Sequence, residues 1–279
     1  MRKPPLLLKD PVWMKILLIL ISFSFLSLIV IIPLLSIFLQ AFAEGWQSYL
    51  RALSTFETIS AIKLSLLVTM IVVPINILFG LVASWLISKF SFPGRQLLIA
   101  SIDLPLSVSP VIAGLIFVLL FNSQTTLGHW FIENGFPIIY AIPGIVLATL
   151  FVTSPYVVRE LIPLLQQLGN DEEEAAHLLG ASGLRTFMRV TLPNIKWGLL
   201  YGTILCTARA LGEFGAVSVV SGNIQGLTNT LPLHVEVLYN EYKFTQAFAV
   251  ASLLTFIAVV TLTLKTVIEL KTGKIQRAG

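Results

Sequence analysis

Long apolar runs separated by short polar segments dominate the chain. A helix needs about 20 mostly apolar residues to cross the hydrocarbon core of a bilayer. The pattern therefore predicts an all-α membrane protein with six transmembrane helices. The six apolar runs are 16–39, 64–87, 97–121, 137–158, 197–221 and 244–268.

The third and fourth runs are interrupted by Pro105, Pro110 and Pro143. A proline inside a helix removes one backbone donor and frees the carbonyl four residues earlier. At membrane depth, freed groups are tolerated where protein or a water-filled path satisfies them. Ser107 and Ser109 add hydroxyl groups beside the prolines of the third run. The pattern has two interpretations: a kinked helix that packs against its neighbours, or a path for a polar solute between the third and fifth helices.

The composition excludes an ordinary soluble domain. Of the 279 residues, 56% are hydrophobic and 11% are charged, whereas soluble domains carry about 25% charged residues. The single cysteine, Cys206, excludes a disulfide framework. The histidines His129, His177 and His234 are far apart in the sequence, so we expect no metal site. Membrane lipid is the expected surrounding, and we expect no nucleic-acid partner.

The first run has two interpretations. A basic segment precedes it and Ala41-Phe42-Ala43 follows it, as in a cleaved signal peptide. The apolar region of a signal peptide is only about 7–15 residues long, and this run is longer. We therefore interpret it as a retained first helix, with cleavage as the alternative.

The basic residues predict the orientation. Cytoplasmic loops of membrane proteins carry an excess of lysine and arginine. In the six-helix arrangement, three basic residues lie on one side: Arg51, Lys63 and Lys243. The other side holds Arg2, Lys3, Lys9, Lys15, Lys89, Arg95, Arg159, Arg185, Arg189, Lys196, Lys265, Lys271, Lys274 and Arg277. This asymmetry predicts that both termini are cytoplasmic.

An acidic stretch between the fourth and fifth runs predicts a short cytoplasmic helix. Asn170 is a good N-cap, and Glu173 stands three residues later, as in a capping box. Asp171 and Glu172 then lie in the first turn, where the helix dipole favours negative charge. Gly180 suits the position just after a helix, where the backbone turns left-handed.

A second short helix is expected directly after the acidic one. Ser182 can cap a helix over 183–190, and Pro193 favours the start of a following helix. The simplest alternative for the whole segment is a solvated loop whose charges keep it out of the bilayer.

The spacing in this segment resembles the EAA loop of the permease subunits of binding-protein-dependent ABC importers. That loop reads EAA, three residues, Gly, nine residues, and then Ile or Val, any residue, Leu and Pro. The matching residues here are Glu174, Ala175, Ala176, Gly180, Val190, Leu192 and Pro193.

The resemblance implies a type I ABC importer permease fold with a cytoplasmic coupling helix. In that family the helix docks in a cleft of an ATPase subunit and transmits closure of the ATPase to the membrane helices. The implied organisation has three parts. Residues 1–59 hold the amino terminus, the first transmembrane helix and an outer loop. Residues 60–270 form the transporter domain with its EAA loop at 170–193, and residues 271–279 form a cytoplasmic tail.

The chain has no phosphate-binding loop of its own. The pattern GxxxxGK[ST] is absent, and the nearest fragment, Thr272-Gly273-Lys274-Ile275, lacks the first glycine and the hydroxyl residue. We therefore expect no enzyme activity and no cofactor in this chain, with ATP and Mg²⁺ bound by a partner ATPase.

A charged pair is expected within the fifth run. Arg209 lies twelve residues beyond Trp197, or about 18 Å along a helix. An ionised residue at this depth is costly, and it indicates a function or a paired partner. Glu213, four residues later, is the expected partner, and Asp103 is the alternative. The pair either contributes to a substrate path or only fixes one helix to a neighbour.

The segment 208–222 resembles oxyanion permeases of the sulfate and molybdate type. The segments 103–114 and 222–233 resemble the W-type permeases of sulfate/thiosulfate importers. The resemblance spans about residues 60–270. It implies sulfate import, with Arg209, Glu213, Ser107, Ser109 and Pro110 as candidates for the substrate path. Thiosulfate, selenate and molybdate remain open as further substrates.

The same resemblance implies the partners and the location. They are a homologous second permease, an ATPase dimer and an external sulfate-binding protein, at the bacterial cytoplasmic (inner) membrane. The alternatives are a molybdate or tungstate permease, a secondary anion transporter and a membrane-embedded enzyme. A secondary transporter is expected to show two related halves, and an enzyme a nucleophile motif such as GxSxG; the sequence has neither.

Overall fold

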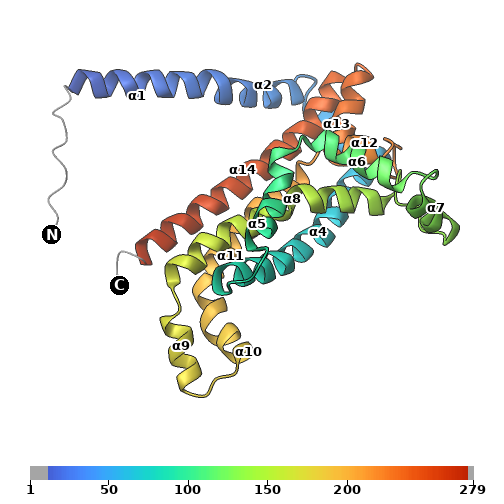
Figure 1. Cartoon of the computed structure of the whole chain (residues 1–279). Helices are drawn as coiled ribbons and strands as arrows, with labels where there is room; N and C mark the ends of the chain where they lie inside the picture. Colours follow the sequence, from blue (N-terminus) through green and yellow to red (C-terminus); the bar gives the residue numbers. More distant parts are fainter. Residues whose placement is uncertain (1–11, 276–279) are drawn as a thin grey trace.

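The computed structural model describes residues 12–275, and over this range the chain consists of helices and connecting loops without a strand (Figure 1). Four of the basic residues used to predict the orientation, Arg2, Lys3, Lys9 and Arg277, lie outside the described residues. The same holds for the last four residues of the predicted cytoplasmic tail.

Within the described residues, four stretches are helical, long and apolar enough to cross a membrane. They are Val12–Ala41, Phe56–Lys89 (α4), Ile142–Leu168 (α8) and the first part of Phe244–Ile275 (α14). A fifth is a broken pair, Arg95–Ser107 (α5) and Pro110–Phe121 (α6), bent by 108°. The remaining predicted span corresponds to Leu192–Leu211 (α11), whose polar residues Lys196 and Arg209 lower its hydropathy. The arrangement is consistent with six membrane-embedded segments.

The first span consists of Val12–Leu26 (α1), a π-helical turn at Ser27–Ile31 (η1) and Ile32–Ala41 (α2). The shorter helices connect the spans. They are Trp46–Leu53 (α3), Thr126–Glu133 (α7), Asp171–Leu178 (α9), Gly183–Thr186 (α10), the π-helical turn Phe187–Thr191 (η2), Gly215–Val220 (α12) and Leu231–Asn240 (α13).

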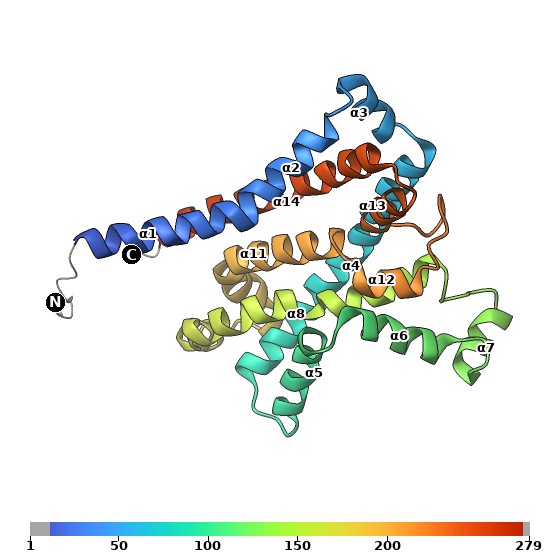
Figure 2. The same ribbon diagram turned by 90° about the horizontal axis from the view of Figure 1, so that it is seen from above.

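The spans alternate in direction, so the connecting segments gather at two opposite ends. Figure 2 shows the start of α1, the end of α14 and the start of α11 at one end, and α3 and α7 at the other. The segment α9–α10 joins the end of α8 to the start of α11 and protrudes from the helices (Figure 1). We call this end of the molecule the α9 end.

The core lies where α4, α8, α11 and α12 pack together. Val72, Val157 and Val217 are buried there with no more than 1% of their surface exposed. Gly80 of α4 lies directly against the side chain of Val157, so a larger residue would separate α4 from α8. Asn76 Nδ2 donates a hydrogen bond of 2.7 Å to Thr153 Oγ1, which satisfies a polar group inside this core.

By contrast, α1 has almost no contact with the rest of the chain. Its 15 residues are strongly apolar and none is buried. The first span contacts the rest of the fold through α2, which packs against α14; Ala41 is fully buried there in a small cluster with Ala52 and Ala249, separate from the core. The first apolar run is therefore a helix at the edge of the fold.

Both π-helical turns end two residues before a proline. The N–H of Ile32 bonds to the Ser27 carbonyl, before Pro33, and the N–H of Leu192 bonds to the Phe187 carbonyl, before Pro193. A proline cannot donate its helical hydrogen bond, and a wider turn just before it accommodates the missing bond. The predicted separate helix at 183–190 is therefore wrong, because α10, η2 and α11 are continuous and Pro193 lies inside them.

The third predicted run is broken instead of kinked. Ser109 precedes Pro110 and has an extended backbone, with φ −58° and ψ 133°. The residue before a proline is sterically excluded from the helical region, so α5 ends and α6 restarts with Pro110 in its first turn. Pro105 lies inside α5 and is buried. Pro143 does not interrupt the fourth run, because α8 begins at Ile142 and a proline is tolerated in a first turn.

The fifth predicted run is also two helices. α11 ends at Leu211, and α12 begins at Gly215 after a short non-helical segment. Glycine weakens a helix by about 1 kcal/mol relative to alanine, and Gly212 and Gly215 lie at the two sides of the break. Gly215 allows close contact, because a Cβ atom there would lie 3.0 Å from Pro110 Cβ. The break in α11–α12 therefore packs against the break in α5–α6.

Candidate functional site

The short acidic helix α9 forms where the sequence predicts it. Four carboxylates occupy its first turn, where they interact favourably with the positive end of the helix dipole. It ends in a Schellman motif: Gly180 N–H bonds to the His177 carbonyl and Ala181 N–H to the Ala176 carbonyl. Gly180 has φ +83°, the left-handed conformation that its sequence position predicts.

The predicted capping box does not form. Asn170 occupies the N-cap position with a helical backbone and makes no side-chain bond to the start of α9. Its Oδ1 instead accepts a hydrogen bond of 3.0 Å from Lys89 Nζ. Ser182 likewise starts α10 without a side-chain cap bond. The start of α9 is thus held by a residue more than 80 positions away.

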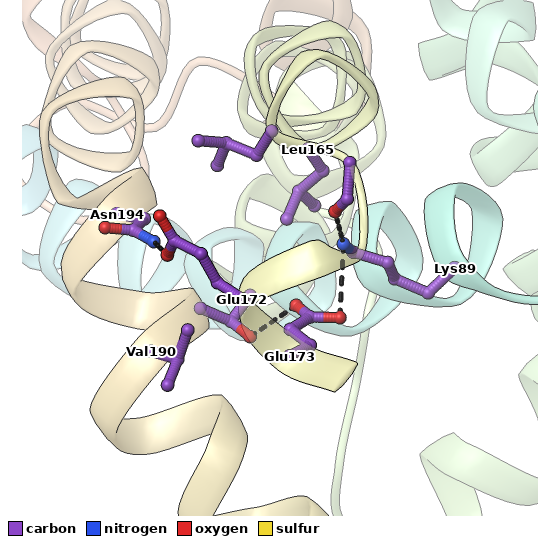
Figure 3. Close-up of a pocket in the computed structure, with 9 residues that line it drawn as sticks. Lys89, Leu165, Glu172, Glu173, Val190 and Asn194 are labelled. Carbon is purple, nitrogen blue, oxygen red and sulfur yellow. Dashed lines mark hydrogen bonds and ion pairs between the residues drawn. The ribbon is translucent and has the colours of Figure 1, made fainter. Parts of the chain in front are cut away.

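Lys89, in the last turn of α4, fixes the junction between α8 and α9 (Figure 3). Its Nζ donates to the Gly169 carbonyl and to Asn170 Oδ1, and it forms an ion pair of 3.1 Å with Glu173 Oε2. An ammonium group has three donors, so Lys89 is fully satisfied. The side chains of Lys89 and Glu173 are only 8% and 19% exposed.

The end of η2 and the start of α11 hold α9 from the other side. Thr191 Oγ1 donates a hydrogen bond of 2.6 Å to Glu173 Oε1. Asn194 Nδ2 donates to Glu172 Oε2, as Figure 3 shows. Val190 lines the small pocket that these side chains surround. We call the polar contacts of Lys89, Asn170, Glu172, Glu173, Thr191 and Asn194 the α9 junction.

The outer side of the α9–α10 segment is apolar and exposed. Leu178 and Leu179 are each 89% exposed, Leu184 is 76% exposed and Met188 is 56% exposed. Glu174 and Ala175 are exposed as well, and Ala176 is half-buried. Several large apolar side chains exposed together on a polar segment indicate a surface for another protein.

The predicted pair between Arg209 and Glu213 forms. Arg209 Nη1 lies 2.7 Å from Glu213 Oε2, with the two side chains 30% and 1% exposed. Glu213 lies beyond the end of α11, however, so the pair spans the break and does not stay on one helix face. Its other oxygen, Oε1, accepts a hydrogen bond of 2.9 Å from the backbone N–H of Ala216 and so caps α12.

The other path candidates lie at the break between α5 and α6. Ser107 and Ser109 are exposed, and Pro110 is half-buried against Gly215. Since Gly215 follows Glu213 by two residues, the structure brings the two groups of candidates to neighbouring helix breaks. It does not bring them to the α9 end, where the EAA residues lie.

The alternative partner of Arg209 is wrong. Asp103 Oδ1 accepts a hydrogen bond of 2.9 Å from Arg159 Nε, and this pair connects α5 to α8. Arg159 is not in a loop, as the orientation argument assumed, because α8 continues to Leu168. The carboxylate of Asp103 balances the charge of Arg159, so α8 can continue beyond this residue.

The sequence analysis missed Lys89 and the exposed leucines. The sequence predicted Lys89 only as one of the basic residues of a loop. A signal existed: a lysine at the end of a long apolar run can reach the carboxylates of the next segment at the same membrane face. For Leu178 and Leu179 the signal was an apolar pair within a polar helix.

Comparison with known protein families gives one match over most of the chain. Residues 76–273 match the family described as binding-protein-dependent transport system inner membrane component. The match includes the end of α4, α8, the α9–α10 segment and α11, and therefore all the residues of the α9 junction.

Individual relatives match over a similar range. The chain is 48% identical over 257 residues to the sulfate transport system permease protein CysW of Escherichia coli (strain K12), covering 92% of this chain and 88% of the relative. It is 35% identical over 233 residues to the sulfate transport system permease protein CysT of the same strain, covering 84% of each.

A solved structure shows the same fold. A chain in the crystal structure of a bacterial alginate ABC transporter, in complex with a periplasmic protein that binds an alginate pentasaccharide, superposes with a TM-score of 0.76. The superposition covers 94% of this chain and 95% of the other at 15% sequence identity. At this identity the likeness concerns the fold alone, which is that of an ABC importer permease.

Proposed function

The chain belongs to the family of inner membrane components of binding-protein-dependent transport systems, and from this premise we propose that it carries sulfate into the cytoplasm as a subunit of an ATP-driven importer. The observation that carries the proposal is the 48% identity to a sulfate permease over 92% of the chain. The 35% identity to a second sulfate permease, CysT, supports a homologous chain as the partner permease.

The substrate class follows from the relatives and not from the fold. Both relatives are sulfate permeases by name, which favours sulfate over the molybdate and tungstate alternatives. The neighbour in structure is a chain of an alginate transporter, so the fold itself is compatible with very different solutes. Family membership also favours an importer driven by a separate ATPase over a secondary transporter or a membrane-embedded enzyme.

In the proposed transporter, α9 is the coupling helix that docks on the ATPase. Two features support this role. Leu178, Leu179 and Leu184 form an exposed apolar surface, and the α9 junction connects the other side of α9 to both α4 and α11. A displacement of α9 by the ATPase would move both helices. Glu174, Ala175 and Ala176 lie on α9, and Gly180 ends the helix.

The two helix breaks are the proposed substrate path. Helix breaks expose backbone groups that are tolerated at membrane depth only beside protein or water. The α5–α6 break carries Ser107 and Ser109 and packs against Gly215 through Pro110, and Arg209 supplies a positive charge for a divalent anion. Because Glu213 neutralises part of that charge, Arg209 would hold sulfate weakly and release it.

The proposed orientation places the α9 end in the cytoplasm. Docking of α9 on an ATPase requires this, and the excess of basic residues on the same side supports it. A protease site inserted after Asn170 should then be cut only from the cytoplasmic side, and one inserted in 122–133 only from outside. The reverse pattern of cleavage would overturn the orientation.

The experiment for the function is sulfate uptake into proteoliposomes. The chain is co-expressed with a homologous permease, the ATPase and the sulfate-binding protein, and labelled sulfate is offered with and without ATP. ATP-dependent uptake that requires the binding protein supports the proposal. Uptake of molybdate but not sulfate, or uptake driven by an ion gradient without ATP, would overturn it.

A further inference from the structure

The ion pair of Asp103 and Arg159 has no role in the function proposed so far. Both residues lie in apolar segments, Asp103 in α5 and Arg159 in the candidate span α8. Their side chains are nevertheless 37% and 57% exposed on this chain. An exposed charge on a membrane helix is costly in lipid, and such residues usually face other protein or a water-filled cavity.

The pair lies more than two helical turns away from the ends of α5 and α8 at the α9 end. Arg159 precedes the end of α8 at Leu168 by nine residues, or about 13 Å. Asp103 follows the start of α5 at Arg95 by eight residues, or about 12 Å. The two residues thus lie at matching depths. Because Arg159 is held by Asp103, it does not extend to the lipid headgroups as arginines near helix ends do.

The contact leaves the recognition edge of the arginine free. Arg159 bonds to Asp103 through Nε, and among the described residues its Nη amino groups have no hydrogen-bond partner. A guanidinium carries five donors in a fixed fork that matches the oxygens of planar and tetrahedral oxyanions. The carboxylate fixes the side chain from the Nε side, and the exposed Nη groups keep their capacity to bind.

The backbone near Arg159 is also polar. Pro163 lies four residues later in α8, so the carbonyl of Arg159 has no helical donor. One turn along α5, Ser107 Oγ donates to the Asp103 carbonyl, at 3.5 Å. Ser107 leads to the break at Ser109. Polar groups therefore continue from Arg159 along α5 to the break that packs against Gly215.

We propose that Arg159, held in place by Asp103, is a second binding position for the transported oxyanion, between the helix breaks and the α9 end. This inference rests on the proposed function. An anion leaving the Arg209 region would next meet the free Nη groups of Arg159. Asp103 weakens the attraction without blocking the fork, so the anion is bound and then released toward the α9 end.

The first experiment measures uptake by the complete transporter in proteoliposomes. The double variant Asp103→Asn/Arg159→Gln removes both charges and leaves no unpaired partner, so the helices are expected to assemble. Sulfate uptake should fall at least about tenfold, which corresponds to about 1.4 kcal/mol. The matched control is Arg51→Gln, which removes an exposed arginine of α3 outside the spans and should leave uptake unchanged. Parental uptake by the assembled double variant would overturn the inference.

A second experiment does not depend on sulfate as the substrate. Arg159→Cys should react with a membrane-impermeant, cationic, thiol-reactive reagent that is applied at the α9 end of the complete transporter. The natural Cys206 is fully buried, so the parental chain should not be labelled and serves as the background. Met70→Cys, at a residue of α4 that is 74% exposed within a span, is the lipid-facing control and should not react. If Arg159→Cys is as unreactive as Met70→Cys, the residue faces lipid or the partner permease, and the inference fails.

The two assays separate the two proposals. Failure of the parental transporter to take up sulfate would overturn the proposed substrate, and reaction of Arg159→Cys would still support a water-filled path at this position.

Modification of Arg159→Cys with a thiol-reactive aminoethyl reagent adds an ammonium group, and it should restore part of the sulfate uptake. A neutral reagent of the same length should not. Equal effects of the two reagents would contradict binding through charge.

Discussion

The ion pairs at the α9 junction and at the break between α11 and α12 differ in how many donors of the cation are used. At the α9 junction, Lys89 uses all three donors on Gly169, Asn170 and Glu173. At the break between α11 and α12, Glu213 is contacted at both carboxylate oxygens, by Arg209 and by the N–H of Ala216. Arg209 has five donors and, among the described residues, only this ion pair.

The difference indicates two roles for a paired cation. A cation without a free donor holds helices together and has nothing left to offer a ligand. A cation with free donors, held by a carboxylate that is itself fixed, can bind a passing anion. Arg209 and Arg159 belong to the second kind. The variants below test this distinction, from the largest expected effect to the smallest.

The largest effect is expected for Arg209→Met, which leaves the carboxylate of Glu213 buried and unpaired. Breaking a buried pair in this way costs about 3–5 kcal/mol. We expect lower recovery and a lower thermal midpoint of the assembled transporter, as well as loss of sulfate uptake. Glu213→Gln should also impair transport.

The double variant Arg209→Met/Glu213→Gln separates structure from transport. Removing both charges is much milder than removing one, so assembly and coupled ATP hydrolysis should return, without sulfate uptake. If the double variant takes up sulfate at the parental rate, Arg209 has only a structural role, and the distinction between the two pairs is lost.

The second effect is expected for Lys89→Met, which leaves three acceptors of the α9 junction without their donor. The cost is about 2 kcal/mol, within the usual range for hydrogen bonds made by a charged group. Because α9 would lose its contact with α4, ATP hydrolysis should continue with less sulfate transported per ATP. The measurement is the ratio of uptake to hydrolysis, with Lys196→Met at an exposed lysine of α11 as the control. An unchanged ratio in Lys89→Met would show that the junction does not transmit motion.

A third effect is expected at the end of α9. Gly180→Val places a β-branched residue at φ +83°, and the left-handed conformation costs about 1–2 kcal/mol. No atom lies within 4 Å of the added Cβ position, so the cause is the backbone and not a clash. Binding of the ATPase should weaken, as measured by co-purification. Gly180→Asn is the matched control, since asparagine tolerates this conformation, and equal binding by both variants would contradict the argument.

Ala175→Trp tests the docking surface directly. Ala175 is exposed on α9, so tryptophan should leave the fold intact and hinder only the contact with the ATPase. Normal co-purification and normal uptake in this variant would exclude close docking at Ala175.

The smallest effect is expected for Asn194→Ala. Its bond to Glu172 joins two exposed side chains, and surface substitutions of this kind usually change stability by no more than about 0.5 kcal/mol. Coupling should stay near the parental value. A loss as large as that of Lys89→Met would mean that the strength of the α9 junction does not follow burial.

The sequence determined the features that depend on neighbouring residues. Apolar runs of membrane length predicted the spans, because the bilayer requires continuous helices that satisfy their own backbone. The carboxylates before α9 and Gly180 after it predicted where that helix begins and ends, since dipole and left-handed turn are local properties. The EAA spacing indicated the family for the same reason, because the pattern lies within one segment.

Only the tertiary structure decided which distant groups meet. The spacing of Asn170 and Glu173 predicts a local capping box. In the structure both side chains instead contact Lys89 of α4, because one ammonium group satisfies three acceptors at once. Asp103 was the alternative partner of Arg209 in the sequence, and the packing of α5 on α8 pairs it with Arg159 instead. The prolines and glycines marked weak points in the helices. Whether a proline or glycine bends, widens or breaks its helix depended on the neighbouring helices. They must satisfy the freed backbone groups and leave room for closer packing of the backbones.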